Sequence, residues 1–422
     1  MDFERHIELD QRIVAAAKDI KVLSWLTWSP DKMADFLARW HRGAPKLPEI
    51  EYPPGDVLDE PMRAFSAAED GLAALDDPVG RYLLDTARSY RVLCQLLQAA
   101  GTGAMAGHSR ELYGAPGDVL SEGSVNNLQA ARHFLKHSEQ FYRATHLHEA
   151  DYCIPAAIVK EDLEKGLGEV FPEGTVKVVV DPNLASKAAA GATRIRLRDE
   201  TCFSEYDIEQ LLQHEAFVHS LTALNGRAQP NITCLSLGAP RTTGPQEGLA
   251  TFAEIVTAAI DIDRLERIAL RVIAIDMALE GADFIEVFRY FLDAGQPETE
   301  SFNSAMRVFR GAPVTGGAAF TKDVVYLHGL LEVHTFFRWA LHNQRMHLCR
   351  NFLAGRMTIT DAIRLAPMFE AGLVAGPTYL PPWMTRTNGL AGYLAFSIFA
   401  SKISVDAIDE HHRFERVDEL SA

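Results

Sequence analysis

Residues 214–219 read His-Glu-Ala-Phe-Val-His and lie within a run of apolar residues at helical spacing. Two neutral imidazoles can hold a zinc ion, and a glutamate beside the first can take a proton from the water that the metal activates. The familiar zinc-peptidase motif has two residues between its glutamate and its second histidine, whereas this segment has three. His214 and His219 are therefore candidate metal ligands, and Glu215 is the candidate general base.

The additional residue changes the geometry of the pair. At 3.6 residues per turn, positions i and i+4 lie about 40° apart around an α-helix, but positions i and i+5 lie about 140° apart. A π-type turn, with i→i+5 hydrogen bonds, returns His214 and His219 to one face, and such turns occur mostly at functional sites. We therefore expect one widened turn between the two histidines.

A two-histidine zinc site needs at least one more protein ligand and an open position for water. The segment Gly244–Ala250, Gly-Pro-Gln-Glu-Gly-Leu-Ala, supplies the best candidate. Pro245 suits the first turn of a helix, which places Glu247 in that turn. Glu247 is the predicted third ligand, although a glutamate there also fits a solvated first turn favoured by the helix dipole. Glu254, two turns on, is either a substitute ligand or a partner for a ligating imidazole.

Local signals also define the elements that must position these residues. Ser204 and Asp207 form a capping box, and Asn225-Gly226 provides a stop, so the metal-binding helix spans about 20 residues. Upstream, Val176–Val180 and Thr193–Leu197 are rich in β-branched residues, which predicts an antiparallel pair. A free edge of that pair can hold an extended peptide through main-chain hydrogen bonds.

The rest of the chain is mostly helical in pattern. Helical periodicity covers residues 5–40, 60–101, 124–150, 159–167, 262–280, 283–294, 298–309, 321–341 and 359–373. Breaks are expected at 45–61, Asp77-Pro78, 101–107 and 377–382, with Gly281, Gly295 and Gly311 ending helices and Thr321 capping one. The predicted fold class is therefore α+β, mostly α-helical, with a small antiparallel β element before the metal-binding helix, in a zincin-like metallopeptidase layout. We predict an α-helical N-terminal region at 1–150 and a zinc metallopeptidase domain at 151–422.

Composition limits the class of protein. The 422-residue chain is 47% hydrophobic and 23% charged, which suits a globular core, and its net charge of −16 disfavours non-specific binding to nucleic acid or anionic membranes. Its five cysteines are odd in number and lack paired spacing, so we expect reduced thiols in a cytoplasmic protein. The first residues lack a signal-peptide pattern. The apolar stretch Leu390–Ile403 is short and contains Lys402, which predicts a buried helix and no membrane span.

These motifs resemble a known family, the bacterial QEGLA-motif proteins described as modulators of flavohaemoglobin expression (domain of unknown function 1704), whose eukaryotic members are the microtubule-associated tyrosine carboxypeptidases. The resemblance covers about residues 105–345. It is carried by His214-Glu215 with His219, Leu221-Thr222 with Asn225-Gly226, Gln246–Ala250, Arg307-Val308 with Arg310-Gly311, Phe320–Asp323 with Tyr326-Leu327, and Glu111–Gly114. Ala216-Phe217 departs from the small Ile-Gly pair expected there, so tubulin-type specificity does not follow.

The resemblance implies that His214, His219 and Glu247 bind Zn²⁺ and that Glu215 is the general base of a carboxypeptidase acting on a peptide or protein C-terminus. Such an enzyme needs a cation for the terminal carboxylate. Arg307, Arg310 and Lys322 are the candidates. Tyr326, four residues after Lys322, is a candidate hydrogen-bond donor to the oxyanion of the tetrahedral intermediate. The two arginines also fit a solvated helix face, and Tyr326 also fits a core position.

Two other functions remain open from the sequence. The zinc site could serve an endopeptidase or hydrolysis of an amide in a small metabolite. The chain could also be a non-catalytic regulatory protein that keeps the fold. A cleavage assay on peptides with free and amidated C-termini distinguishes the carboxypeptidase from the first alternative. Metal analysis of the purified protein distinguishes it from the second.

Overall fold

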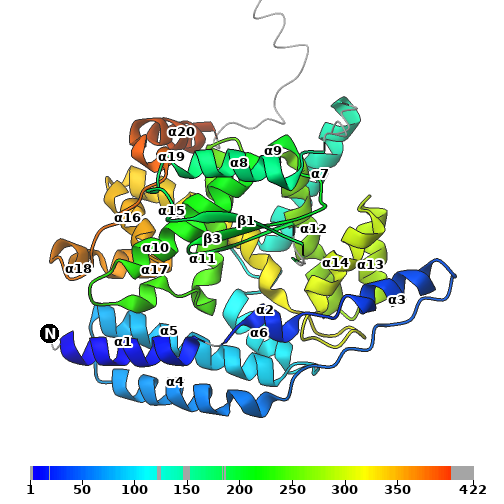
Figure 1. Cartoon of the computed structure of the whole chain (residues 1–422), viewed down its shortest axis with the longest axis horizontal. Coiled ribbons are helices and arrows are strands. Elements are labelled where there is room, and N and C mark those ends of the chain that lie inside the picture. Colours follow the sequence, from blue (N-terminus) through cyan, green and yellow to red (C-terminus); the bar gives the residue numbers. More distant parts are fainter. Residues whose placement is uncertain are drawn as a thin grey trace, which may run out of the picture.

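A computed structural model describes residues 3–18, 20–120, 125–145, 153–182, 184 and 187–400, with the side chains of 142–145 left out. The fold is mostly helical around a small three-stranded sheet near the centre of Figure 1. One buried hydrophobic cluster extends from Leu9 to Leu394 and includes the centre of the helix that carries His214 and His219. The proposed division of the chain at residue 150 stays a prediction.

The first helices form a layer at the lower side of Figure 1, where α1, α4 and α5 pack against one another. The elements of the chain up to residue 145 are α1 (Phe3–Ala17), α2 (Val22–Leu26), α3 (Asp31–Trp40), η1 (Gly55–Leu58), α4 (Asp59–Leu72), α5 (Pro78–Gln98), α6 (Met105–Tyr113) and α7 (Asn127–Thr145). The predicted break at Asp77-Pro78 is confirmed, because the Asp77 side chain caps α5 and Pro78 takes its first position.

The sheet differs from the predicted antiparallel pair. It contains β1 (Lys177–Asp181), β2 (Ala188–Gly191) and β3 (Arg194–Arg198) in the order β1-β3-β2. β3 pairs antiparallel with β2 and parallel with β1, so the prediction for the two β-branched runs was wrong. The reason is the alanine-rich segment between them, which forms a strand despite its low β propensity and takes the hairpin position beside β3.

Helix α8 (Ala156–Leu167) packs on β1 and β3 and on the helix that carries His214 and His219. That helix comprises α9 (Glu205–Leu211), η2 (Leu212–Ser220) and α10 (Leu221–Arg227), and the Ser204–Asp207 capping box is confirmed. Its end differs slightly from the prediction. Asn225 and Gly226 lie inside the last turn, and the Asn225 amide bonds the carbonyls of Leu353 and Tyr379.

The later helices include three whose predicted glycine ends are confirmed, since Gly281, Gly295 and Gly311 have positive φ. The elements are η3 (Thr233–Ser236), η4 (Pro240–Thr242), α11 (Thr243–Val256), α12 (Ile262–Leu279), α13 (Phe284–Asp293), α14 (Glu298–Phe309), η5 (Thr321–Asp323), α15 (Val324–His342), α16 (Met346–Asn351), η6 (Phe352–Ala354), α17 (Ile359–Arg364), α18 (Ala366–Glu370), α19 (Pro382–Thr385) and α20 (Thr387–Ala400). Thr321 does not cap the helix as expected, because its hydroxyl pairs with Ser109 on α6.

Helices α11 and α15 make the closest approach among these elements. A Cβ added at Gly248 would lie 2.2 Å from the backbone carbonyl of Gly329, and one at Gly329 would lie 2.2 Å from the carbonyl oxygen of Gly244. The two backbones therefore touch directly, which only glycine permits. This contact fixes α11, which carries Glu247, against the start of α15, which follows Lys322.

The cysteine prediction was wrong for one pair. Cys153 and Cys202 form a disulfide across 49 positions, because the adjacent Ile154 and Phe203 exchange two backbone hydrogen bonds and draw the two segments together. Cys94, Cys234 and Cys349 are free and buried. Burial raises the pKa of the Cys94 thiol to about 11, which keeps it protonated. A cytoplasmic location, which rested partly on reduced thiols, stays a prediction.

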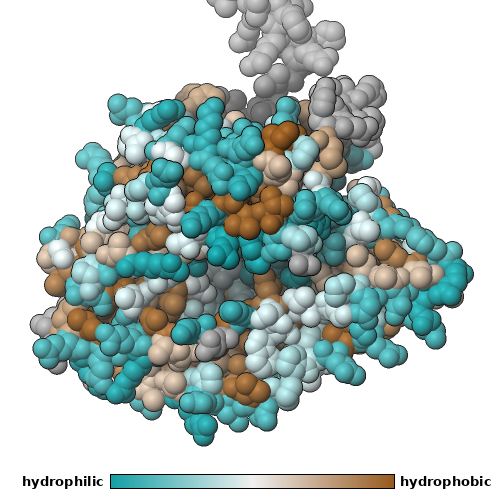
Figure 2. Space-filling model, viewed as in Figure 1, coloured by the Kyte–Doolittle hydropathy of each residue, from teal (hydrophilic) through white to brown (hydrophobic). Residues whose placement is uncertain are grey.

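Helix α20 is less buried than expected. Leu390 and Leu394 are buried, but Phe396 and Phe399 are 71% and 63% exposed, and residues 401–403 lie outside the described part of the chain. Within that part, none of the helices combines the length and the apolar character needed to cross a bilayer. On the face in Figure 2, hydrophilic residues dominate and apolar residues form separate patches.

The glycine contact between α11 and α15 can be tested by Gly248→Ala. The added methyl group must push the two backbones apart, so we expect a loss of about 1–3 kcal/mol in the free energy of unfolding, as for an overpacked core. Chemical denaturation measures it. Gly107→Ala is the control, because Gly107 lies in α6 with no atom within 4 Å of the new Cβ, and there alanine should be neutral or stabilising by up to about 1 kcal/mol. Equal stability of the two variants would contradict the contact.

Candidate metal centre

The widened turn expected between the two histidines is confirmed. Leu212–Ser220 form a π-helix, nine residues long, between α9 and α10. The imidazoles of His214 and His219 consequently face each other, with ring centroids 4.8 Å apart. A regular α-helix would have placed them about 140° apart.

Glu247 completes a compact cluster with the two imidazoles. Its Oε2 atom lies 3.3 Å from Nε2 of His214 and 3.5 Å from Nε2 of His219, and the ligand atoms of all three residues lie within 4.8 Å of one another. Around a tetrahedral zinc ion with bonds of about 2.0–2.1 Å, ligand atoms are separated by about 3.3–3.4 Å. Glu247 Oε2 is also buried without a hydrogen-bond partner. The three residues therefore fit a zinc ion.

Glu254 has the partner role that the sequence left open. Its Oε1 lies 2.6 Å from Nδ1 of His214, and the residue is fully buried on α11. An ionised carboxylate only accepts hydrogen bonds, so Nδ1 donates a proton to Glu254, and Nε2 is the nitrogen that a metal ion shared with Glu247 would bind. Arg264 on α12 bonds the same carboxylate at 3.3 Å. Burial raises the pKa of Glu254, but Arg264 and His214 outweigh it and lower the pKa below its usual value.

Opposite charges within the cluster shift the pKa values of His214 and Glu247. Burial by itself lowers the pKa of His214, yet the carboxylates of Glu247 and Glu254 raise it well above the usual value. Burial raises the pKa of Glu247, but Lys322 and the two histidines lower it well below its usual value. A cation between these groups is thus favoured, and a metal ion must displace the proton that His214 otherwise holds.

Glu215 lies on the π-helix beside this cluster. It is only partly buried, and its carboxylate makes no hydrogen bond or ion pair with the described residues. It is nonetheless close enough to His214 to act on it electrostatically. An accessible carboxylate without a fixed partner can accept a proton from a water molecule.

Lys322 and Tyr326 also lie at the cluster. The Lys322 ammonium is 3.6 Å from Oε1 of Glu247 and 5.7 Å from the centre of the Tyr326 ring. The Arg264 guanidinium lies 5.7 Å from the same ring. Tyr326 is therefore close to two cations at the edge of the site, and its partly buried ring also packs against the hydrophobic core.

The two arginines of the later motif have different surroundings, and neither lies on a solvated face. Arg307 forms a bidentate pair with Asp323, at 2.6 and 2.8 Å. Arg310 has a buried Nε atom without a hydrogen-bond partner. Burial and the neighbouring Arg307 lower the pKa of Arg310 to about 10. Arg307 thus has a structural partner, whereas Arg310 retains unused donor capacity.

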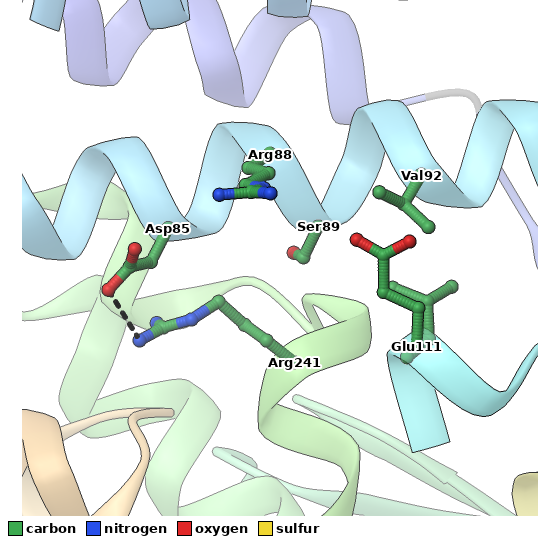
Figure 3. Close-up of a pocket in the computed structure, with 7 residues that line it drawn as sticks. Asp85, Arg88, Ser89, Val92, Glu111 and Arg241 are labelled. Carbon is green, nitrogen blue, oxygen red and sulfur yellow. Dashed lines mark ion pairs between the residues drawn. The ribbon is translucent and has the colours of Figure 1, made fainter. Parts of the chain in front are cut away.

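Helix α11 is anchored from its N-terminal side by Arg241 on η4. The guanidinium lies 2.7 Å from the fully buried Asp361 carboxylate and 3.8 Å from Asp85 on α5. Figure 3 shows Arg241 with Asp85 and Glu111 at the lining of a cavity. The volume of this cavity is about 120 Å³. Because η4 leads directly into α11, this ion pair also fixes the start of the helix that carries Glu247.

Several residues of the site could not be found from the sequence. Arg264 and Arg356 carry no recognisable motif, and Asp323 lies in a motif without an assigned role, because each meets its partner through tertiary packing. Arg356, for example, donates to the carbonyl of His219, 137 residues earlier. His328 and His334 on α15 contact Asn127 and Ser397, respectively, rather than the cluster.

Metal binding can be tested by removing a ligand or its partner. Glu254→Gln should weaken zinc binding about 10–100-fold, because His214 loses the carboxylate that orients it, and Glu247→Gln should weaken it further. Competition with a chromophoric chelator measures the affinity. His334→Ala, on α15 but outside the cluster, should bind zinc like the wild type. Unchanged affinity in both glutamate variants would exclude this cluster as the metal site.

Comparisons with known proteins agree with the motifs. The family model described as microtubule-associated tyrosine carboxypeptidase matches residues 34–402, a longer span than the motifs indicated. No curated protein matches the chain. Among solved structures, the "putative lipoprotein from Colwellia psychrerythraea" is 12% identical over 94% of this chain and 77% of that chain, with a TM-score of 0.41, which is too low to support an argument. The family name describes a carboxypeptidase, whose substrates are peptides or proteins. Because the matched span covers most of the sequence and contains the whole cluster, the chain belongs to the microtubule-associated tyrosine carboxypeptidase family.

Proposed function

We propose that this protein is a zinc-dependent carboxypeptidase that removes a C-terminal residue from a peptide or protein. The observation that carries the proposal is the meeting of His214, His219 and Glu247, whose ligand atoms lie within 4.8 Å of one another beside an unpartnered Glu215. Two imidazoles and one carboxylate are a ligand set of catalytic zinc sites.

The metal ion and the protein side chains would have separate roles in the reaction. When bound, zinc supplies a Lewis acid for the scissile carbonyl and brings the pKa of a coordinated water toward ~7. Glu215 accepts a proton from the attacking water and passes it to the leaving amine. Glu254 holds the His214 ring by its Nδ1 proton throughout, and Tyr326 donates a hydrogen bond to the developing oxyanion.

The cations at the site favour an anionic substrate end. Four cations interact electrostatically with the Asp323 carboxylate: Arg271, Arg307, Arg310 and Lys322. Four cations around one carboxylate leave an excess of positive charge, which Lys322 shares in part with Glu247. A terminal carboxylate would neutralise that excess, and Arg310 offers the unused donors.

The sheet supports binding of an extended peptide. β2 is an outer strand and contacts the π-helix, and the Ser220 hydroxyl donates to the Gly191 carbonyl at 2.8 Å. A peptide that adds beside an outer strand is held by main-chain hydrogen bonds, which are independent of its sequence. This arrangement fits a C-terminal segment running along the sheet toward the metal.

The general base can be tested with Glu215→Gln. The amide cannot accept the proton, so kcat should fall about 10²–10⁴-fold while zinc remains bound. Single-turnover cleavage and metal analysis of the same sample measure the two quantities. Glu209→Gln, an exposed position on α9, is the control and should keep full activity. Full activity of Glu215→Gln would refute the assignment.

Recognition of the terminal carboxylate can be tested with paired peptides. The wild type should cleave a free-acid peptide and reject its C-terminal amide, and Arg310→Gln should reduce that preference by raising KM for the acid. In contrast, Arg307→Gln should lower the free energy of unfolding by about 1–3 kcal/mol, because Asp323 loses a bidentate partner. Equal cleavage of acid and amide by the wild type would indicate an endopeptidase or another amidase.

A further inference from the structure

The π-helix at the metal centre needs contacts from outside itself. π-helices usually extend for a single turn inside an α-helix, whereas this one extends over nine residues. At its C-terminal junction the Leu221 amide faces the carbonyls of both Ala216 and Val218, so the i→i+5 pattern gives way there to a shorter one. Carbonyls near such a change of register need donors from elsewhere.

Two side chains meet that need, and a third links the segment to the sheet. The Thr222 hydroxyl donates to the Val218 carbonyl at 2.7 Å, and Arg356 donates through Nη2 to the His219 carbonyl at 3.1 Å. The Ser220 hydroxyl ties the same segment to β2. Only the contact from Arg356 is charge-assisted, and it falls on a proposed metal ligand.

The backbone of Arg356 is firmly placed. Its amide donates to the Leu235 carbonyl at 2.7 Å, and its own carbonyl accepts from the Tyr82 hydroxyl at 3.2 Å. The preceding Gly355 lies so close to Leu235 that a Cβ there would be 2.8 Å from the Leu235 Cβ. The guanidinium is therefore presented from a rigid point on the C-terminal part of the chain.

Gly238 leaves the space that the guanidinium occupies. A Cβ at Gly238 would lie 2.8 Å from Nη1 of Arg356. The Nε atom is buried without a hydrogen-bond partner, and no described carboxylate lies within ion-pair distance of the guanidinium. Glu215 and Glu247 are near enough only to act on it electrostatically. The bond to the His219 carbonyl is thus its one directional contact with the metal-binding helix.

We propose that Arg356 is a positioning residue for the metal centre: its guanidinium, seated in the space at Gly238, holds the His219 carbonyl and so maintains the π register in which both imidazoles face one ion. This inference rests on the proposed function for its metal. It assigns the C-terminal part of the chain a role in the geometry of the active site.

The test is the zinc affinity of the full-length protein, measured by chelator competition. Arg356→Gln should weaken zinc binding about 10-fold or more, and Arg356→Lys, which keeps a cationic donor, should recover part of the loss. Wild-type affinity in Arg356→Gln would overturn the inference while leaving the proposed function intact. A wild type that binds no zinc would overturn both.

A second variant separates positioning from loss of folding. Gly238→Ala keeps Arg356 but crowds its guanidinium, so it should weaken zinc binding in the wild type and add nothing in the Arg356→Gln background. Additive effects would overturn the shared mechanism. Thermal unfolding of each variant identifies any that fails to fold, and Arg356→Lys and Gly238→Ala then carry the test.

The kinetic parameters provide an independent outcome. At saturating zinc a displaced His219 should lower kcat with little change in KM. A raised KM with normal kcat and normal zinc affinity would instead make Arg356 a contact to the substrate, which overturns the positioning role.

Discussion

Two imidazoles five residues apart share a metal ion only if the helix between them is wider than an α-helix. That requirement governs the architecture around Leu212–Ser220. The sheet supports one side of the π-helix through β2, and α8 packs on it as well. Helix α11 brings Glu247 and Glu254 to the face on which the imidazoles meet. The unusual hydrogen-bond register is thus stabilised by tertiary contacts rather than by local preference.

Charge balance is the second constraint on the centre. Glu215, Glu247 and Glu254 gather acidic charge around the two histidines, and Arg264 and Lys322 offset it from α12 and η5. Burial of such groups is tolerable only when each meets an opposite charge or a hydrogen bond. This arrangement still favours a cation among the ligand atoms of His214, His219 and Glu247, which supports the proposal that the cluster is a metal site.

Much of the helical framework and of the site could be predicted from the sequence, because the relevant signals are local. The spacing of His214 and His219 required the π turn, Ser204 and Asp207 marked a helix start, and three glycines marked helix ends. The errors came from non-local pairing. The alanine-rich β2 shows no strand propensity, Thr321 caps nothing because Ser109 takes its hydroxyl, and Cys153 finds Cys202 only after folding. The role of Arg356 could not be predicted either, because its contact with the His219 carbonyl also joins distant parts of the sequence.

The disulfide has a consequence for the chain before it folds. A cross-link spanning 49 positions removes conformational entropy from the unfolded ensemble, which corresponds to about 4 kcal/mol in the chain-entropy model. The closed loop contains α8 and all three strands, and it ends just before Ser204, the cap of the helix that carries His214 and His219. The oxidation state of these two sulfurs therefore influences how readily the support beneath the π-helix assembles, even though neither atom belongs to the metal cluster.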